Sequence, residues 1–107
     1  MIEKLLQQER ELERAKIVSE TAKIPWQELQ RFFAAGKVLW VAQHLDLVDI
    51  AHALQRDDVP AVQALTESGH LAPASDAQAK RWVSDKALLW AVVIKPWVLV
   101  QEPGADA

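Results

Sequence analysis

The apolar run from Leu88 to Gln101, LLWAVVIKPWVLVQ, constrains this chain more than any other stretch of its sequence. It is rich in Val, Ile and Trp, which favour strands over helices. Apolar side chains occupy both alternating faces of such a strand, with Trp90 and Val92 on one face and Leu89 and Val93 on the other. A strand of this kind is normally covered on both sides. We therefore expect helices, or in part a second copy of the chain, to pack against its two faces.

Lys95 and Pro96 interrupt this run. Each remaining apolar piece is shorter than the roughly 20 residues that a membrane-spanning helix needs, so the sequence predicts no membrane span. The same pair either bends one bulged strand or forms the turn of a hairpin between residues 88–94 and 97–101. Both alternatives are compatible with the sequence.

The bulk properties are those of an ordinary globular domain. With 107 residues, we expect a single domain over residues 1–101 and a loose tail over 102–107. The net charge of -3 argues against nucleic acid as a partner, because phosphate contacts require clustered Lys and Arg. Residues 1–16 carry charge where an export signal has an apolar segment, so we expect a cytoplasmic protein.

Helix signals recur along the chain. Pro25 suits a first helical turn, and Gly36 suits the position after a helix end, where φ is positive. Asp46 and Ser75 are typical helix caps, and Gln78 stands at capping-box spacing from Ser75. The sequence predicts helices at about 2–20, 25–35, 46–56, 59–68 and 76–84.

Two further segments favour strands. Residues 37–42, KVLWVA, follow a glycine directly and are expected beside the C-terminal strand. Residues 70–74 are compatible with a brief third strand, which Pro73 confines to an edge or a loop. The predicted fold class is α+β, with a small, mostly antiparallel sheet packed by four or five helices.

The N-terminal helix has two interpretations. It is charged, and its apolar residues spread around the helix without a sustained heptad, so a long coiled coil is not expected. It either docks near its C-terminal end through Ala15 and Val18 or serves as a dimerisation arm.

Several blocks occur together in a fixed order: IPWQELQRFFAAGKVLWV, LDLVDIA, the pair Asp57 and Asp58, SDAQAKRW and LWAVVIKPWVLVQ. In these blocks the chain resembles an uncharacterised bacterial family, the domain of unknown function 2288, from about residue 15 to residue 101. The resemblance implies a small bacterial, cytoplasmic protein without assigned chemistry, and it transfers no catalytic residues. Residues 1–14 fall outside it.

Ligand-type side chains gather in one region. His44, Asp46, Asp49 and His52 could together hold a divalent ion, since Asp49 and His52 are adjacent on a helix. Against this, both Asp residues suit the positive end of the helix dipole, and His52 is expected to face water.

Other catalytic signatures are missing from the sequence. No Ser or Thr lies in a nucleophile elbow, and three glycines cannot form the usual phosphate-binding loops. Asp57 and Asp58, adjacent at a helix start, are more typical of caps than of an acid and base pair. The sequence therefore predicts no cofactor and favours a protein without catalytic activity.

Five tryptophans are difficult to bury in so small a domain. Either all five fill the core or some face a partner, and Trp97, Trp90 and Trp40 are the candidates for an interaction surface. The leading hypothesis is a non-catalytic module that forms a homo-oligomer, such as a dimer, or binds another protein. The alternative is a metal-dependent enzyme or small-ligand-binding protein that uses the His and Asp group.

Overall fold

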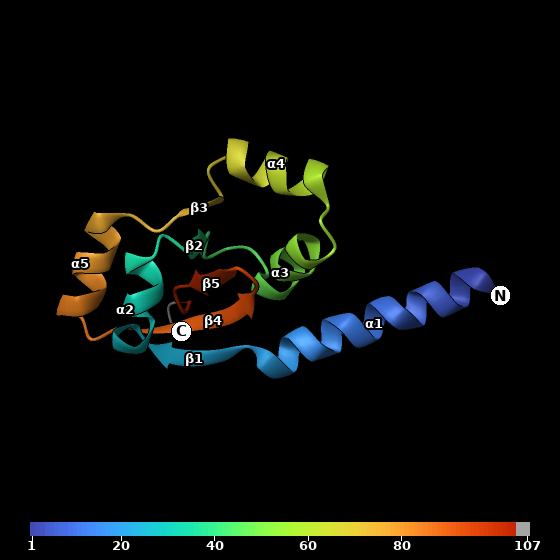
Figure 1. Cartoon of the computed structure of the whole chain (residues 1–107), viewed down its shortest axis with the longest axis horizontal. Coiled ribbons are helices and arrows are strands. Elements are labelled where there is room, and N and C mark those ends of the chain that lie inside the picture. The colour runs from blue at the N-terminus through green and yellow to red at the C-terminus, as the bar shows by residue number, and fades with distance from the viewer. Residues whose placement is uncertain (105–107) are drawn as a thin grey trace.

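The computed structural model describes residues 1–104. Its elements follow the chain in the order α1 (Ile2–Glu20), β1 (Ala22–Pro25), α2 (Trp26–Ala34), β2 (Val38–Val41), α3 (Leu47–Gln55), α4 (Val59–Glu67), β3 (Leu71–Pro73), α5 (Asp76–Ser84), β4 (Leu88–Ile94) and β5 (Trp97–Gln101). Figure 1 shows the sheet between two groups of helices, with α1 projecting beyond them. The fold is α+β, as predicted.

The five strands form one sheet in the order β1-β4-β5-β2-β3. All neighbours are antiparallel except β2 and β5, which run parallel. The predicted strands at 37–42 and 88–101 and the short edge strand near 70–74 are therefore confirmed. Lys95 and Pro96 form the turn between β4 and β5, so the hairpin alternative is correct.

Strand β1 was not predicted. Pro25 was expected as the first residue of a helix, but it has extended backbone angles and precedes the helix, which begins at Trp26. The reason lies outside the local sequence, because Ala22–Pro25 pairs along β4, with Pro25 opposite Leu88. Only four residues long, β1 forms one edge of the sheet.

One face of the sheet is covered by α2 and α5. Trp26 and Trp82 from these helices are buried against Leu89, Val98 and Val100 of the sheet. Their rings meet edge to face, with centroids 4.9 Å apart. The two indole rings are the largest buried side chains of this core, which aliphatic residues complete.

The opposite face is covered by α3, α4 and the C-terminal end of α1. Leu47, Ile50 and Ala51 of α3 pack on Val92 and Leu99. Helix α1 contributes Ile17, the one residue of this helix that is buried. Docking near the C-terminal end was expected correctly, but it occurs through Ile17 and not through Ala15 and Val18, whose side chains are exposed.

Coverage of the apolar run is less complete than its sequence suggests. Strand β5 is central and buried on both faces, with Val98, Leu99 and Val100 enclosed. Strand β4 lies next to the edge, and Leu88, Trp90 and Val93 are left exposed.

The helix ends follow local chemistry. Asp46, Asp58 and Ser75 accept hydrogen bonds from backbone N–H groups of α3, α4 and α5, and Ser75 with Gln78 completes a capping box. Gly36 has a φ of 73°, which a residue without a Cβ adopts readily. Asp57 and Asp58 thus occupy a helix junction, where Asp58 serves as a cap.

The segment after β5 is fastened to the body. Glu102 accepts a hydrogen bond from Nε1 of Trp40, and the carbonyl oxygen of Pro103 accepts one from Nε2 of Gln43. The rest of the predicted tail, residues 105–107, lies outside the described residues. Within residues 1–104, none of the helices combines the length and the apolar character needed to cross a membrane.

Gln101 provides a test of how the sheet holds the segment before α3. Its side chain is 8% exposed, and Nε2 donates to the carbonyl oxygens of Ala42 and Leu45 at 2.9 and 2.7 Å. Replacing Gln101 by Leu leaves both carbonyl groups without this donor, so we expect a loss of about 2 kcal/mol in unfolding free energy and roughly 10 °C in Tm. Thermal unfolding followed by circular dichroism measures this loss.

The exposed Gln27→Leu variant is the matched control, and its Tm should stay close to that of the wild type. Equal effects of the two substitutions would contradict the role assigned to Gln101.

Candidate functional site

Three of the four candidate metal ligands, Asp46, Asp49 and His52, lie where α1 crosses α3. Asp46 and Asp49 both accept hydrogen bonds from the guanidinium group of Arg14, at N···O distances of 3.2 and 2.9 Å. Asp46 also caps α3 by accepting the N–H of Val48 at 2.9 Å. The two carboxylates are therefore engaged in attaching α1 to α3.

His52 is part of the same junction. Its Nε2 lies 3.0 Å from Oε2 of Glu13, and Arg56 donates to both oxygens of that carboxylate at 3.3 and 3.2 Å. The hydrogen bond with His52, together with the charge of Arg56, lowers the pKa of Glu13 below its usual value of 4.5. The expectation that His52 faces water is wrong, because only 17% of its side chain is exposed and its Nε2 atom contacts Glu13 of α1.

His44 lies apart from this junction. Its ring meets the ring of His70 edge to face, with centroids 4.9 Å apart. Among residues 1–104, no three His, Asp or Glu side chains are grouped as a metal ion would require. The site at His44, Asp46, Asp49 and His52 stays a prediction of the sequence, and the arrangement of these side chains does not favour it.

The three candidate tryptophans occupy different environments. Trp40 packs half-buried in the core beneath α2 and α5, whereas Trp97 packs half-buried in the core beneath α3 and α4. Trp90 is the most open of the three, with 36% of its surface exposed. The structure thus distributes the three rings over both faces of the sheet and leaves Trp90 at the surface.

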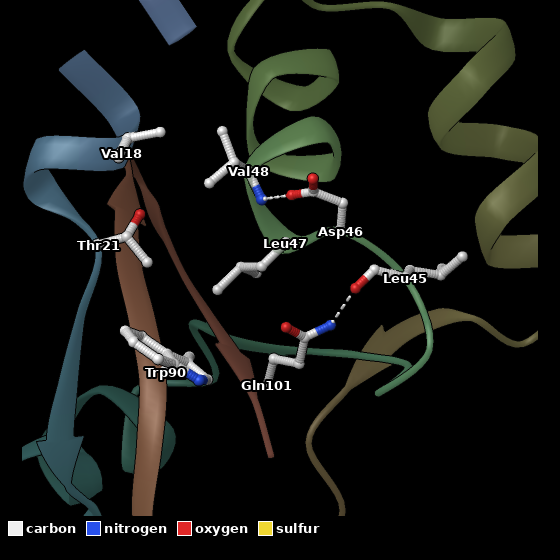
Figure 2. Close-up of a pocket in the computed structure, with 8 residues that line it drawn as sticks. All are labelled: Val18, Thr21, Leu45, Asp46, Leu47, Val48, Trp90 and Gln101. Atoms are coloured by element: carbon white, nitrogen blue, oxygen red, sulfur yellow. Dashed lines mark hydrogen bonds between the residues drawn. The ribbon is translucent and has the colours of Figure 1, made fainter. Parts of the chain in front are cut away.

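Trp90 forms the floor of a pocket of about 320 Å³ between the end of α1 and the start of α3. Figure 2 shows the eight residues that line it, which are Val18, Thr21, Leu45, Asp46, Leu47, Val48, Trp90 and Gln101. We call it the Trp90 pocket. Its size is near the lower limit for small-molecule sites and is also suited to one or two side chains of a protein partner.

The pocket exists because two helices end above one strand. Trp90 and Val92 point to the same face of the sheet, and the core residues of α3 cover Val92. Trp90 lacks this cover, because α1 ends at Glu20 and α3 begins at Leu47. Leu88, on the same face, is 51% exposed and extends the apolar surface beyond the pocket.

The polar groups of the pocket are mostly committed. Thr21 donates its hydroxyl hydrogen to the carbonyl oxygen of Ile17, and Asp46 serves as cap and ion-pair partner. Gln101 uses its amide nitrogen in two hydrogen bonds, while its amide oxygen points toward Leu47 and Trp90 (Figure 2). The pocket can therefore accept an apolar group and offer that oxygen to a hydrogen-bond donor.

Lys23 of β1 stands beside this surface. It lies opposite Trp90 in the strand register, and its Nζ atom is 5.2 Å from the centroid of the indole ring. A cation at this distance is attracted by the electron-rich ring face. The exposed indole is thus partly shielded by one exposed, charged side chain that a partner can displace.

Sequence reasoning did not identify Gln101, Lys23 or Val18 as neighbours of Trp90. Gln101 carries the one available signal, a polar residue at the end of an apolar strand. Lys23 depends on β1, which was not predicted, and Val18 depends on how α1 lies over the sheet. Neither could be placed without the tertiary arrangement.

The sequence matches a family described as a protein of unknown function, DUF2288, over residues 12–102. The chain belongs to this family. The match confirms the resemblance and extends from the docked part of α1 through β5, so it includes every residue of the Trp90 pocket. No curated protein is significantly similar to the chain.

A solved structure supports the fold. The solution NMR structure of PA1075 from Pseudomonas aeruginosa is 44% identical in sequence, with a TM-score of 0.78. The similarity covers 90% of this chain and 89% of that one. The two proteins thus share this arrangement of sheet and helices.

The junction between α1 and α3 predicts a dependence of stability on pH. Because the pKa of Glu13 is lowered in the folded state, its ionised form stabilises the fold at neutral pH. This stabilisation is complete above the ordinary pKa of 4.5 and is lost as the pH falls through the lowered value. The wild type should therefore melt above the Glu13→Gln variant at neutral pH, and the difference should vanish in acid.

The Glu3→Gln variant provides the control, since Glu3 lies exposed on the same helix and its carboxylate makes no hydrogen bond to α3 within the described part of the chain. Melting temperatures of the wild type and both variants, measured from neutral pH down to about pH 3, test this prediction. A difference between wild type and Glu13→Gln that is independent of pH would refute the assignment.

Proposed function

We propose that the protein is a non-catalytic interaction module that contacts another protein, or a second copy of itself, through the surface around Trp90. The observation that carries this proposal is the exposure of Trp90 and Leu88 side by side on one face of the sheet, next to an open pocket. Tryptophan is enriched at the energetic centres of protein interfaces. A partner would cover apolar area that the protein's own helices leave open.

The chemistry of the pocket supports binding rather than catalysis. Its walls are mainly Val and Leu side chains, and its carboxylate, Asp46, is held by Arg14 and by the backbone of α3. General acid–base catalysis requires a titratable group free to exchange a proton with a substrate. The amide oxygen of Gln101 suits recognition of a donor, and the indole N–H of Trp90 suits recognition of an acceptor.

The same features define the partner's contact. An aliphatic or aromatic side chain fits between Val18, Val48 and Trp90, and a neighbouring N–H or O–H group of the partner can donate to Gln101. Lys23 moves aside or pairs with an acidic group of the partner. Because a pocket of this size holds few side chains, we expect the anchor to be a short segment of the partner.

Indole N–H signals of ¹⁵N-labelled protein test this proposal. The five tryptophans give one signal each, and a Trp90→Phe variant identifies the signal of Trp90. We expect this signal to shift on binding of a co-purified protein or with increasing protein concentration, because its ring lies in the contact. The signals of Trp26 and Trp82, enclosed in the opposite core, serve as internal controls.

The affinity provides a second measurement. Truncating a central tryptophan typically costs about 2 kcal/mol or more, so Trp90→Ala should weaken binding roughly 30-fold. Trp97→Phe, in the core beneath α3 and α4, should leave affinity nearly unchanged. The proposal fails if the protein captures no partner and the Trp90 signal moves neither with a co-purified protein nor with protein concentration.

A further inference from the structure

The side of α1 that faces away from the body carries a regular pattern. Glu13, Arg14 and Ile17 face α3 and the sheet. On the opposite side of the helix, positions 1, 5, 8, 12 and 15 follow one another at intervals of four and three residues, and Met1, Leu5, Leu12 and Ala15 among them are apolar. Such spacing is that of the seam in a two-stranded coiled coil.

This seam is open to solvent. Met1, Leu5 and Leu12 are 101, 62 and 72% exposed, respectively. Figure 1 shows why, since α1 continues well beyond α3 and its N-terminus is far from the sheet. A short helix in water is marginally stable unless another surface packs on it. The first three turns of α1 therefore need cover that the body of the same chain does not provide.

The charges beside the seam indicate what provides that cover. Lys4 and Glu11 flank it on one side, and Glu9 and Lys16 flank it on the other. In a parallel pair of helices, a residue on the first side meets the residue five positions later on the partner helix. Lys4 then meets Glu9 of the second copy, and Glu11 meets Lys16 of the second copy. Because a two-fold axis relates the two copies, each of these attractive pairs occurs twice.

Antiparallel pairing matches these charges less well. In the register that sets Leu5 against Ala15 of the second copy, Glu9 and Glu11 each meet their own counterparts and repel them. In the antiparallel register that sets Met1 against Leu12 of the second copy, only residues 1–12 overlap. Lys16 then lies beyond the end of the partner helix. The parallel arrangement is the one that uses the whole seam and all four charged residues.

We propose that α1 forms a short parallel coiled coil with α1 of a second copy, through Met1, Leu5, Gln8, Leu12 and Ala15. Because each body docks on the side of α1 opposite the seam, the two bodies lie on the outside of the pair and do not collide. None of the five seam residues lines the Trp90 pocket, so the pairing uses a different set of side chains. The inference therefore goes beyond the function proposed above.

Light scattering of size-fractionated protein tests the pairing. The wild type should have twice the 12.0 kDa mass of the chain, and a variant with both Leu5→Gln and Leu12→Gln should have the mass of one chain. The matched control is Leu6→Gln, which removes an exposed leucine outside the seam and should keep the double mass. Circular dichroism verifies that the body of the double variant still unfolds cooperatively.

Cross-linking tests the orientation, because the chain has no native cysteine. A parallel pair places the two copies of Ala15→Cys face to face, whereas either antiparallel register separates them by about 15 Å or more along the helix axis. We expect mild oxidation to convert Ala15→Cys into a covalent dimer and to leave Gln7→Cys, outside the seam, as single chains.

A wild type of single mass, or a double variant that keeps the double mass, overturns the pairing. Loss of the dimer in the double variant without cross-linking of Ala15→Cys overturns the parallel orientation. These results are distinct from failure of the Trp90 surface, since the Trp90 indole signal is followed in the double variant, where no seam remains. A shift of that signal on partner binding would then persist without the coiled coil.

Discussion

Burial of β5 on both faces is the constraint from which the rest of the architecture follows. Val98 and Val100 point into one core and Leu99 points into the other, so each face of the sheet requires its own layer of helices. Parallel pairing with β2 on one side and antiparallel pairing with β4 on the other leave β5 no free backbone edge. The apolar side chains of α2, α3 and α5 can be buried only against this strand and its neighbours.

The two layers are built differently. Beneath α2 and α5, aromatic rings from Trp26 and Trp82 fill the space, and their Nε1 atoms are buried without hydrogen-bond partners in the described structure. Beneath α3, aliphatic side chains form the core, and polar contacts around Glu13 and Arg14 attach α1 at its rim. Individual surface ion pairs contribute little, but here several converge on one helix crossing. The position of α1, and with it the outline of the Trp90 pocket, depends on this crossing.

Much of the fold could be predicted because local patterns and tertiary structure agree. The capping box at Ser75, the cap at Asp46 and the glycine at Gly36 identify helix ends from neighbouring residues alone. Strand β1 could not be found in this way, since four residues ending in proline become a strand only when β4 is beside them. The candidate site was harder still. Its acidic and histidine residues were recognised, but their partners on α1 lie 32 to 39 residues away in sequence. The exposure of Trp90 depends on how α1 and α3 lie over β4, which correct helix ends alone do not specify.

The edges of the sheet bear on how copies of this protein can assemble. An unpaired strand edge invites further strands and, repeated without limit, leads to fibrils. Here one edge is the four-residue β1, with Lys23 and Pro25, and the other is the three-residue β3, which ends at Pro73. Proline lacks the donor that an added strand would need, and lysine resists dehydration. Growth of the sheet from molecule to molecule is therefore disfavoured, which leaves closed assemblies built from side-chain contacts as the route to association.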